Sequence, residues 1–212
     1  MKLYAYDHCP FCTRVRFITG IKNIPIEMHY LPWDDEQTPV QLAGKKEVPI
    51  FEDDEGNRMT GSLDIVAWLD NHTGEPMLKA ENRPEVDAWL SDAMLPLQKI
   101  GYPRWPLLLL PEFQSARARD AWRAAKEREI NGFDESLAET PMLVEPIYAL
   151  FERAEALLGD AIHGGAPVTW TELKLFTFLR GFTCESSLRW PIALRKWLDL
   201  RSRHCAVPLF WS

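Results

Sequence analysis

The sequence has few cysteines and no long hydrophobic run. Only four cysteines occur among 212 residues, too few for the disulfide framework of a small secreted fold. The strongest apolar run, residues 105–110, is bracketed by prolines and is far too short to span a bilayer. No secretory signal is visible, because Asp7 and His8 interrupt the first apolar stretch. We therefore expect a cytoplasmic protein whose thiols stay mostly reduced.

Basic residues are also fewer than acidic ones. The 24 lysines and arginines are outnumbered by 31 aspartates and glutamates, which leaves a net charge of -7. So acidic a chain is a poor partner for nucleic acid or for an anionic membrane. We therefore expect the nine tryptophans to pack in the core and at a domain interface rather than to stack on bases.

The first 72 residues alternate between strand and helix patterns. The order βαβαββα predicts a mixed sheet with helices on its faces. A hairpin turn is expected at residues 54–57, and Ser62 is the predicted N-cap of the last helix. The expected strands are 2–6, 26–31, 48–53 and 58–60, and the expected helices are 10–20, 39–44 and 63–72.

The composition changes beyond residue 72. Residues 73–84 hold two prolines and a glycine, which is typical of a linker. No convincing strand follows, so residues 85–212 are expected to form an all-helical domain. Thr169 and Glu172 predict a capping box at the start of one helix. The expected helices are 84–101, 113–130, 134–158, 170–183 and 190–204.

Cys9 and Cys12 form a Cys-x-x-Cys pair, for which three interpretations compete: a zinc site, two inert thiols or a redox pair. A structural zinc site needs four ligands, and Cys184 and Cys205 lie far along the chain from this pair and from each other. His8 adjoins Cys9, but one histidine does not complete such a site. No metal site is therefore expected, and the two distant cysteines are interpreted as small buried hydrophobic residues.

The setting of the pair favours a redox role. Cys9 falls at a strand-to-helix junction, where free amides and the helix dipole stabilise a thiolate. Cys12 lies one turn further on, close enough to close a disulfide with Cys9. Arg14 and Arg16 add positive charge in the next turn. We therefore predict that Cys9 is the nucleophile and that the less exposed Cys12 resolves its mixed disulfides.

Three motifs resemble those of glutathione-dependent proteins. Residues 9–12, Cys-Pro-Phe-Cys, are similar to the Cys-Pro-Tyr-Cys motif of glutaredoxins. Val48-Pro49 resembles the cis-proline site of thioredoxin-like folds. Residues 61–65 resemble the helix start where glutathione transferases and glutaredoxins hold the γ-glutamyl end of glutathione. Together with a helical second domain, these motifs make the whole chain look most like the bacterial glutaredoxin 2 family.

The resemblance implies an α/β thioredoxin-like domain at residues 1–72, a linker at 73–84 and an all-α domain at 85–212, in a glutathione-transferase-like architecture. It also implies a monomeric, glutathione-dependent thiol–disulfide oxidoreductase with a redox-active disulfide. Glutathione is then the reductant, and the partners are glutathionylated proteins or small disulfides. Cys9 takes the glutathionyl group from a mixed disulfide, and a second glutathione or Cys12 clears it.

The glutathione contacts that the resemblance carries over each have a plainer alternative. The backbone of Val48 would pair with the tripeptide beside a cis Pro49, or Pro49 only starts a strand. Ser62 would bind a carboxylate at a helix N-terminus, or it only caps the helix. Asp64 would meet the α-amino group of glutathione, although an acid in a first helical turn needs no ligand.

Some positions depart from the pattern of the family. Phe11, an expected glutathione contact, replaces the usual Tyr and removes a hydroxyl beside Cys9. Gly61 stands where transferases often have Glu or Gln, so one polar contact to glutathione is missing. Glu47 brings a negative charge near an anionic ligand. Lys46, or its neighbour Lys45, would meet the glycyl carboxylate, and a solvated loop charge is the alternative.

Two other functions share this architecture. A glutathione transferase or a dehydroascorbate-reductase-like enzyme would use the same glutathione site, with the helical domain completing a site for the second substrate. A transferase activates the thiol of glutathione with a hydroxyl and has no need of Cys12. A non-catalytic adaptor, whose helical domain binds a partner protein, tends to lose the reactive pair. The presence of both cysteines favours the oxidoreductase.

Overall fold

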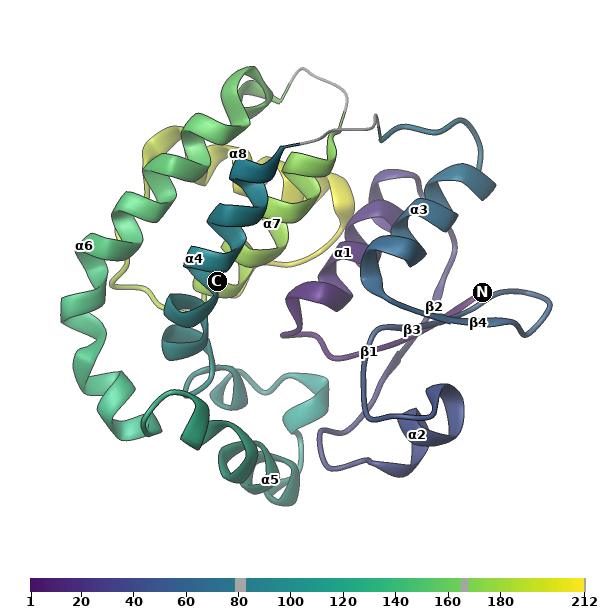
Figure 1. Ribbon diagram of the computed structural model, residues 1–212, viewed down its shortest axis with the longest axis horizontal. Helices are drawn as coiled ribbons and strands as arrows, with labels where there is room; N and C mark the ends of the chain where they lie inside the picture. The colour runs from purple at the N-terminus through teal and green to yellow at the C-terminus, as the bar shows by residue number, and fades with distance from the viewer. Residues whose placement is uncertain (79–82, 165–167, 212) are drawn as a thin grey trace.

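A sheet covered by helices and a bundle of helices lie side by side in this protein (Figure 1). The structure, a computed structural model, describes residues 1–78, 83–164 and 168–211. No helix among these residues has both the length and the apolar character needed to cross a membrane. The linker predicted at residues 73–84 falls partly outside the described residues.

The sheet has four strands in the order β2-β1-β3-β4. Strand β1 (Lys2–Ala5) pairs parallel with β2 (Glu27–Tyr30) and antiparallel with β3 (Ile50–Glu52). Strand β4 (Arg58–Thr60) returns antiparallel to β3 through the expected hairpin turn. The predicted mixed sheet is confirmed, and its order places the end of β1, and therefore Cys9, at the centre of the molecule.

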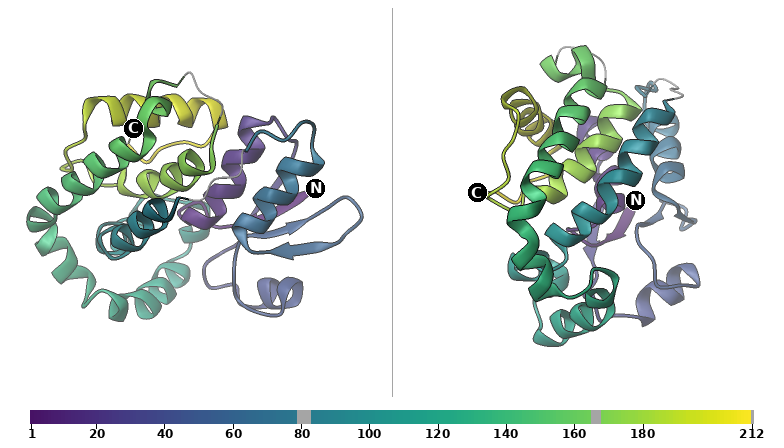
Figure 2. Two further views of the ribbon diagram at one scale, coloured as in Figure 1. Left: turned by 45° about the horizontal axis from the view of Figure 1, so that its top comes forward. Right: turned by 60° about the vertical axis from the view of Figure 1, so that its left-hand side comes forward.

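Three helices cover the sheet, with α1 and α3 on one face and α2 on the other (Figures 1 and 2). Helix α1 (Pro10–Ile21) begins at its proline, as predicted. Helix α2 (Gln37–Ala43) ends at a glycine in the left-handed conformation. Helix α3 (Ser62–His72) corrects one prediction: its N-cap is Gly61, and Ser62 is already the first helical residue. Gly61 has φ of +87°, so the backbone turns into the helix at a position where a side chain is disfavoured.

The rest of the chain is helical, and none of its described residues forms a strand. The capping box predicted at Thr169 and Glu172 is present. The helix predicted at 113–130 is shorter, because the side chain of Ser115 caps it and short 3-10 turns flank it. The helices are α4 (Pro84–Gly101), α5 (Ala116–Lys126), α6 (Phe133–Leu158), α7 (Trp170–Phe182) and α8 (Ile192–Cys205), and the 3-10 turns are Trp105–Leu107, Pro111–Phe113, Glu127–Glu129 and Gly159–His163.

A buried arginine joins the two parts of the chain. Arg180 of α7 donates hydrogen bonds to the backbone carbonyl and the carboxylate of Asp7, which follows β1. The same guanidinium bonds the carbonyl of Pro208 and lies 4.1 Å from the ring centre of Phe210. Arg180 therefore fixes the segment that leads into Cys9 against α7 and the C-terminal tail.

Candidate active site

The two cysteines of the pair meet at the N-terminus of α1. Cys9 is the N-cap residue, and its sulfur accepts a hydrogen bond from the amide of Cys12 at 3.4 Å. Cys9 keeps 8% of its surface exposed, whereas Cys12 is fully buried. Both thiols are free in this structure. A substrate disulfide can therefore reach Cys9 first, and Cys12 only after Cys9 has reacted.

The surroundings of the two thiols drive their pKa values apart. The hydrogen bond from the thiol of Cys12 is the main cause that lowers the pKa of Cys9 to about 7, and it acts against the effect of burial. The charge of His8 and the amides of Cys12 and Phe11 lower it further. Burial raises the pKa of Cys12 well above its ordinary value. Near neutral pH, Cys9 is thus poised to ionise while Cys12 keeps its proton as a donor.

The two other cysteines lack these features. Burial is the main cause that raises the pKa of Cys184 to about 12 and that of Cys205 to about 11. Cys205 is buried, as expected, and Cys184 is half-buried. Among the described residues, no group of three histidine, cysteine or acidic side chains is placed to hold a metal ion. The reactive sulfur chemistry of the described chain is therefore concentrated at Cys9.

The two arginines of α1 differ in what they contact. Arg14 is buried, lies 4.8 Å from the ring centre of Phe11, and donates a hydrogen bond to the hydroxyl of Ser62 at 3.2 Å. Arg16 instead pairs with Asp7. Both arginines bring positive charge to this turn, as expected, but that of Arg16 is paired with a carboxylate.

A buried histidine–glutamate pair stands beside Cys9. Nδ1 of His8 donates to Oε1 of Glu112 at 2.6 Å, and the backbone amide of His8 donates to the same oxygen at 2.9 Å. The imidazole is enclosed by the rings of Trp105, Phe113 and Trp122, at centroid distances of 4.8 to 5.2 Å. Sequence reasoning noticed His8 only as an incomplete zinc ligand. Nothing local to residue 112 signalled a partner 104 positions away.

A cavity of about 410 Å³ lies between the first turns of α1 and the start of α3, and we call it the helix-end cavity. It brings together five of the predicted site residues, and the Val48–Pro49 peptide bond in its wall is cis, as expected from the resemblance. The lining residues are Phe11, Arg14, Glu47, Val48, Pro49, Gly61, Ser62, Leu63 and Asp64.

A second cavity, of about 490 Å³, lies on the other side of Cys9 and reaches the helical part of the chain; we call it the interdomain cavity. Phe11, Glu47 and Val48 line both cavities, whereas Cys9 lines only the interdomain cavity. Lys46 lines the interdomain cavity, where its ammonium lies 3.3 Å from Glu36 and 5.0 Å from the ring centre of Trp33. The structure thus places Lys46 near Cys9 but apart from Ser62 and Asp64.

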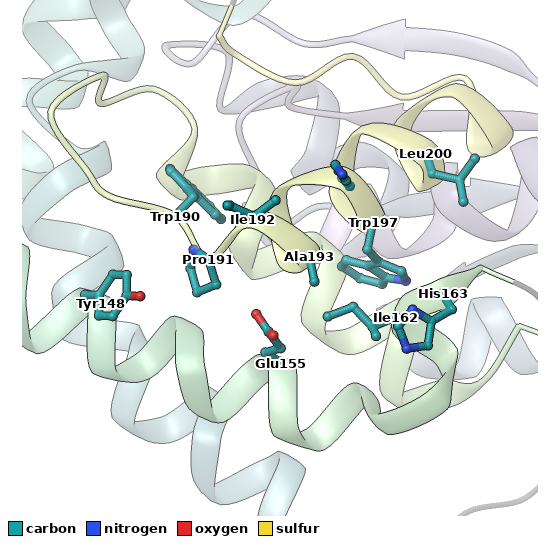
Figure 3. Close-up of a pocket in the computed structure, with 11 residues that line it drawn as sticks. Tyr148, Glu155, Ile162, His163, Trp190, Pro191, Ile192, Ala193, Trp197 and Leu200 are labelled. Atoms are coloured by element: carbon teal, nitrogen blue, oxygen red, sulfur yellow. The ribbon is translucent and has the colours of Figure 1, made fainter.

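A larger cavity lies elsewhere, between α6 and α8, with a volume of about 740 Å³ (Figure 3). Figure 3 shows the carboxylate of Glu155 pointing from α6 toward α8, near Pro191 and Ile162. None of the cysteines lines this cavity. Size alone therefore does not identify the reactive site, and the two smaller cavities beside Cys9 are the better candidates.

Comparisons with known proteins agree over the whole length of the chain. Residues 85–212 match the family described as glutaredoxin 2, C terminal domain, and residues 3–77 match the glutathione S-transferase N-terminal domain. Glutaredoxin 2 of Escherichia coli (strain K12) is 32% identical over 214 residues, which covers 100% of this chain and 99% of that protein.

Solved structures of a glutaredoxin 2 and of a glutathione S-transferase also resemble this chain. Glutaredoxin 2 from Salmonella typhimurium, in complex with glutathione, is 32% identical, with a TM-score of 0.92 over 99% of this chain and 96% of that one. A glutathione S-transferase of Ceriporiopsis subvermispora is 16% identical, with a TM-score of 0.73 over 98% of each chain. The second likeness shows a shared fold alone.

Proposed function

Because this chain belongs to the glutaredoxin 2 family, we propose that it is a glutathione-dependent thiol–disulfide oxidoreductase that removes glutathione from mixed disulfides. One observation carries the proposal: Cys9 is the partly exposed member of the pair, and its pKa is lowered to about 7 at a helix N-terminus. A thiolate with a pKa near the ambient pH combines abundance with nucleophilicity, which suits it to thiol–disulfide exchange.

The reaction proceeds in two exchanges. The thiolate of Cys9 attacks the glutathione sulfur of a protein–glutathione disulfide, and the protein thiolate leaves and takes up a proton. The thiolate of a second glutathione then attacks the glutathionyl sulfur held on Cys9, which yields oxidised glutathione and restores Cys9. In the alternative second step, Cys12 loses its proton and attacks the sulfur of Cys9, which forms a Cys9–Cys12 disulfide and releases glutathione; two further glutathione molecules then reduce that disulfide. The raised pKa of Cys12 disfavours this step and supports the route through the second glutathione.

The helix-end cavity is the proposed site for the γ-glutamyl end of glutathione. Its walls hold the backbone of Val48 beside Pro49, the hydroxyl of Ser62 and the carboxylate of Asp64, with Phe11 at the edge. The Val48 backbone would pair with the cysteinyl unit of glutathione, and Asp64 would accept from its α-amino group. Lys46, on the other side of Phe11, is proposed to meet the glycyl carboxylate.

We also propose domain boundaries, a cellular location with an oligomeric state, and a class of partners. Residues 1–72 and 85–212 are proposed as the two domains, joined by the linker 73–84. We propose that the protein acts in the cytoplasm, because thiols stay reduced in that compartment. We also propose that it is a monomer, as the family resemblance implies. Its partners are proposed to be glutathionylated proteins and low-molecular-weight disulfides, with the interdomain cavity next to Cys9 receiving the group that departs.

The test is glutathione-driven reduction of a small glutathione mixed disulfide by three proteins in parallel: wild type, Cys9→Ser and Cys12→Ser. We expect Cys9→Ser to be inactive and Cys12→Ser to keep much of the activity, since the second glutathione can clear Cys9. If all three proteins are inactive, glutathione is not the working reductant.

The transferase alternative is not favoured, because the full-length relatives are glutaredoxins and the likeness to transferases shows only the fold. It makes a distinct prediction: conjugation of glutathione to an aromatic electrophile that survives Cys9→Ser. The adaptor alternative predicts instead that a partner protein binds equally well to a variant lacking both Cys9 and Cys12.

A further inference from the structure

Among the described residues three arginines are buried, and one of them has no carboxylate as a partner. Arg180, 1% exposed, pairs with the carboxylate of Asp7 at 2.9 Å, and Arg201, 3% exposed, pairs with Glu172 at 2.6 Å. Arg14 is only 7% exposed, yet within the described residues it forms no ion pair. Its charged group has one neutral acceptor, the hydroxyl of Ser62.

Part of the guanidinium of Arg14 also has no hydrogen-bond partner. Its Nε is buried without an acceptor among the described residues. Burial is the main cause that lowers the pKa of Arg14 to about 10, and a lone buried cation is disfavoured unless an anion compensates it. The charge of Cys9 is the main electrostatic support for the Arg14 cation and that of Asp87 comes after it, while the carboxylate of Asp87 is itself paired with Lys174 at 2.6 Å. Among the described residues, the guanidinium of Arg14 therefore has no carboxylate of its own.

The helix-end cavity, which Arg14 lines, has the other features of a carboxylate site. Within α3, the first backbone amide to find an intrahelical acceptor is that of Ile65, which donates to Gly61. The amides of the preceding turn, from residue 62 to residue 64, therefore sit at the positive end of the helix dipole. The hydroxyl of Ser62, already held by Arg14, stands at the same place.

The acidic groups of this cavity do not occupy Arg14. Glu47 pairs with Lys45 at 2.8 Å. The carboxylate of Asp64 lies toward Gly61, where Oδ2 is 2.7 Å from the position that a Cβ would take. Because Gly61 has no side chain and its φ of +87° disfavours one, residue 61 cannot supply a side-chain contact to the ligand. Arg14 is therefore the side chain in the wall of this cavity that is available to bind an anionic group of the ligand.

We propose that Arg14 is a glutathione-binding residue of this protein and that it pairs with the α-carboxylate of the γ-glutamyl unit. The inference rests on the proposed function and names the cation that recognises one end of its co-substrate. The carboxylate would accept from the guanidinium of Arg14 and from the free amides at the start of α3. Bound glutathione would thereby supply the carboxylate that, among the buried arginines of the described residues, Arg14 alone is without.

The test compares two ligands that differ only in this carboxylate. S-methylglutathione is titrated calorimetrically against S-methyl-(4-aminobutyryl)-cysteinylglycine, which lacks the α-carboxylate and cannot undergo thiol exchange. Wild type is expected to prefer S-methylglutathione by about 30-fold or more, the loss typical of a broken buried charge pair. In Arg14→Gln the preference is expected to fall to a few-fold, since the cation is gone.

Arg16→Gln is the matched control, because it removes an arginine from the same helix whose guanidinium pairs with Asp7. It is expected to keep the wild-type preference. Arg14→Lys keeps the charge but loses the fork of donors, and we expect it to show an intermediate preference; it also provides the measurement if Arg14→Gln does not fold.

The possible outcomes distinguish a failure of the Arg14 assignment from a failure of the proposed glutathione-dependent function. If wild type binds S-methylglutathione and Arg14→Gln keeps the full preference, the role of Arg14 is overturned while the proposed function stands. If wild type does not bind S-methylglutathione, the proposed function fails and this inference fails with it. A preference that falls in Arg16→Gln as much as in Arg14→Gln also overturns the assignment, because it would report only net charge.

Discussion

Glu112 of the helical part lies 2.6 Å from Nδ1 of His8, the residue immediately before the nucleophile Cys9. Both side chains are buried, and Oε1 of Glu112 also accepts the backbone amide of His8. The helical part thus fixes the chain at the entrance to the reactive cysteine and places an anion behind a histidine whose charge lowers the pKa of Cys9. In this geometry, the second part of the chain helps to set the reactivity of the first.

Replacing Glu112 is therefore expected to change the pKa of Cys9 through His8, which lies between them in the hydrogen-bonded chain of contacts. In Glu112→Gln the imidazole of His8 loses its anionic partner, so the pKa of Cys9 should rise above its value of about 7. The pH dependence of iodoacetamide alkylation measures this shift. Glu112→Leu also leaves the amide of His8 unpaired and should cost about 3 kcal/mol of unfolding free energy. An unchanged alkylation midpoint in Glu112→Gln would contradict the electrostatic role of the pair.

The hydrogen bond from Cys12 is the largest cause of the lowered pKa of Cys9. Wild type should therefore alkylate at Cys9 with a midpoint near pH 7, and Cys12→Ala should move that midpoint upward. Cys12→Ser keeps a donor, and a hydroxyl donates more strongly than a thiol, so its midpoint should stay below that of Cys12→Ala. Equal midpoints for Cys12→Ala and wild type would show that the helix N-terminus and His8 suffice without this donor.

Acid should destabilise the contact between the two parts of the chain. Burial opposes the ionisation of Asp7, but the charges of Arg180 and Arg16 outweigh it and hold the pKa of Asp7 below its ordinary value. A carboxylate with a lowered pKa adds stability that is fully present above the unfolded value, about 4, and is lost as the pH falls through the folded value.

Urea unfolding at pH 7 and at pH 3 measures this loss. Wild type should lose stability between the two conditions, and Asp7→Asn should lose less, because its side chain cannot be protonated in that range. The variant should already be less stable at pH 7, since it leaves Arg180 without its anion. An equal acid-induced loss in both proteins would show that other carboxylates dominate.

Two glycines with positive φ offer a matched pair for the helix-end cavity. Gly61 and Gly44 have φ of +87° and +79°, so an alanine at either position should cost about 1–2 kcal/mol of stability. A Cβ at Gly44 meets nothing within 4 Å, whereas one at Gly61 would press on the carboxylate of Asp64. Glutathione affinity should therefore fall in Gly61→Ala and stay unchanged in Gly44→Ala, as measured by calorimetry. An equal affinity in both variants would argue against Asp64 as a contact.

The sequence signals that predicted the fold were local ones. Pro10 begins α1, the glycine after residue 43 ends α2, and Thr169 with Glu172 opens α7. Each of these signals acts through backbone conformation or through a hydrogen bond within a few residues, so the chain itself carries the information. The position of the cysteine pair at a strand-to-helix junction was predictable for the same reason.

The parts of the site that sequence reasoning missed depend on distant partners. His8 and Glu112 are 104 residues apart, and Arg14 reaches Ser62 across 48 residues. The cap of α3 was assigned to Ser62, because serine is a favoured capping side chain. The structure uses the backbone freedom of Gly61 instead and leaves the serine hydroxyl to Arg14. Only the packing of α1 against α3 brings these groups together.

The aromatic wall of the interdomain cavity has an optical consequence. Trp33, Trp105 and Trp122 line the same cavity as Cys9, and their rings contact the imidazole of the residue beside it or one another. A disulfide accepts an electron from an excited indole far more readily than a thiol does. Oxidation of Cys9 and Cys12 to a disulfide should therefore lower the intensity of the tryptophan fluorescence, and reduction should restore it. The protein would report its own oxidation state as emitted light, with no dye attached.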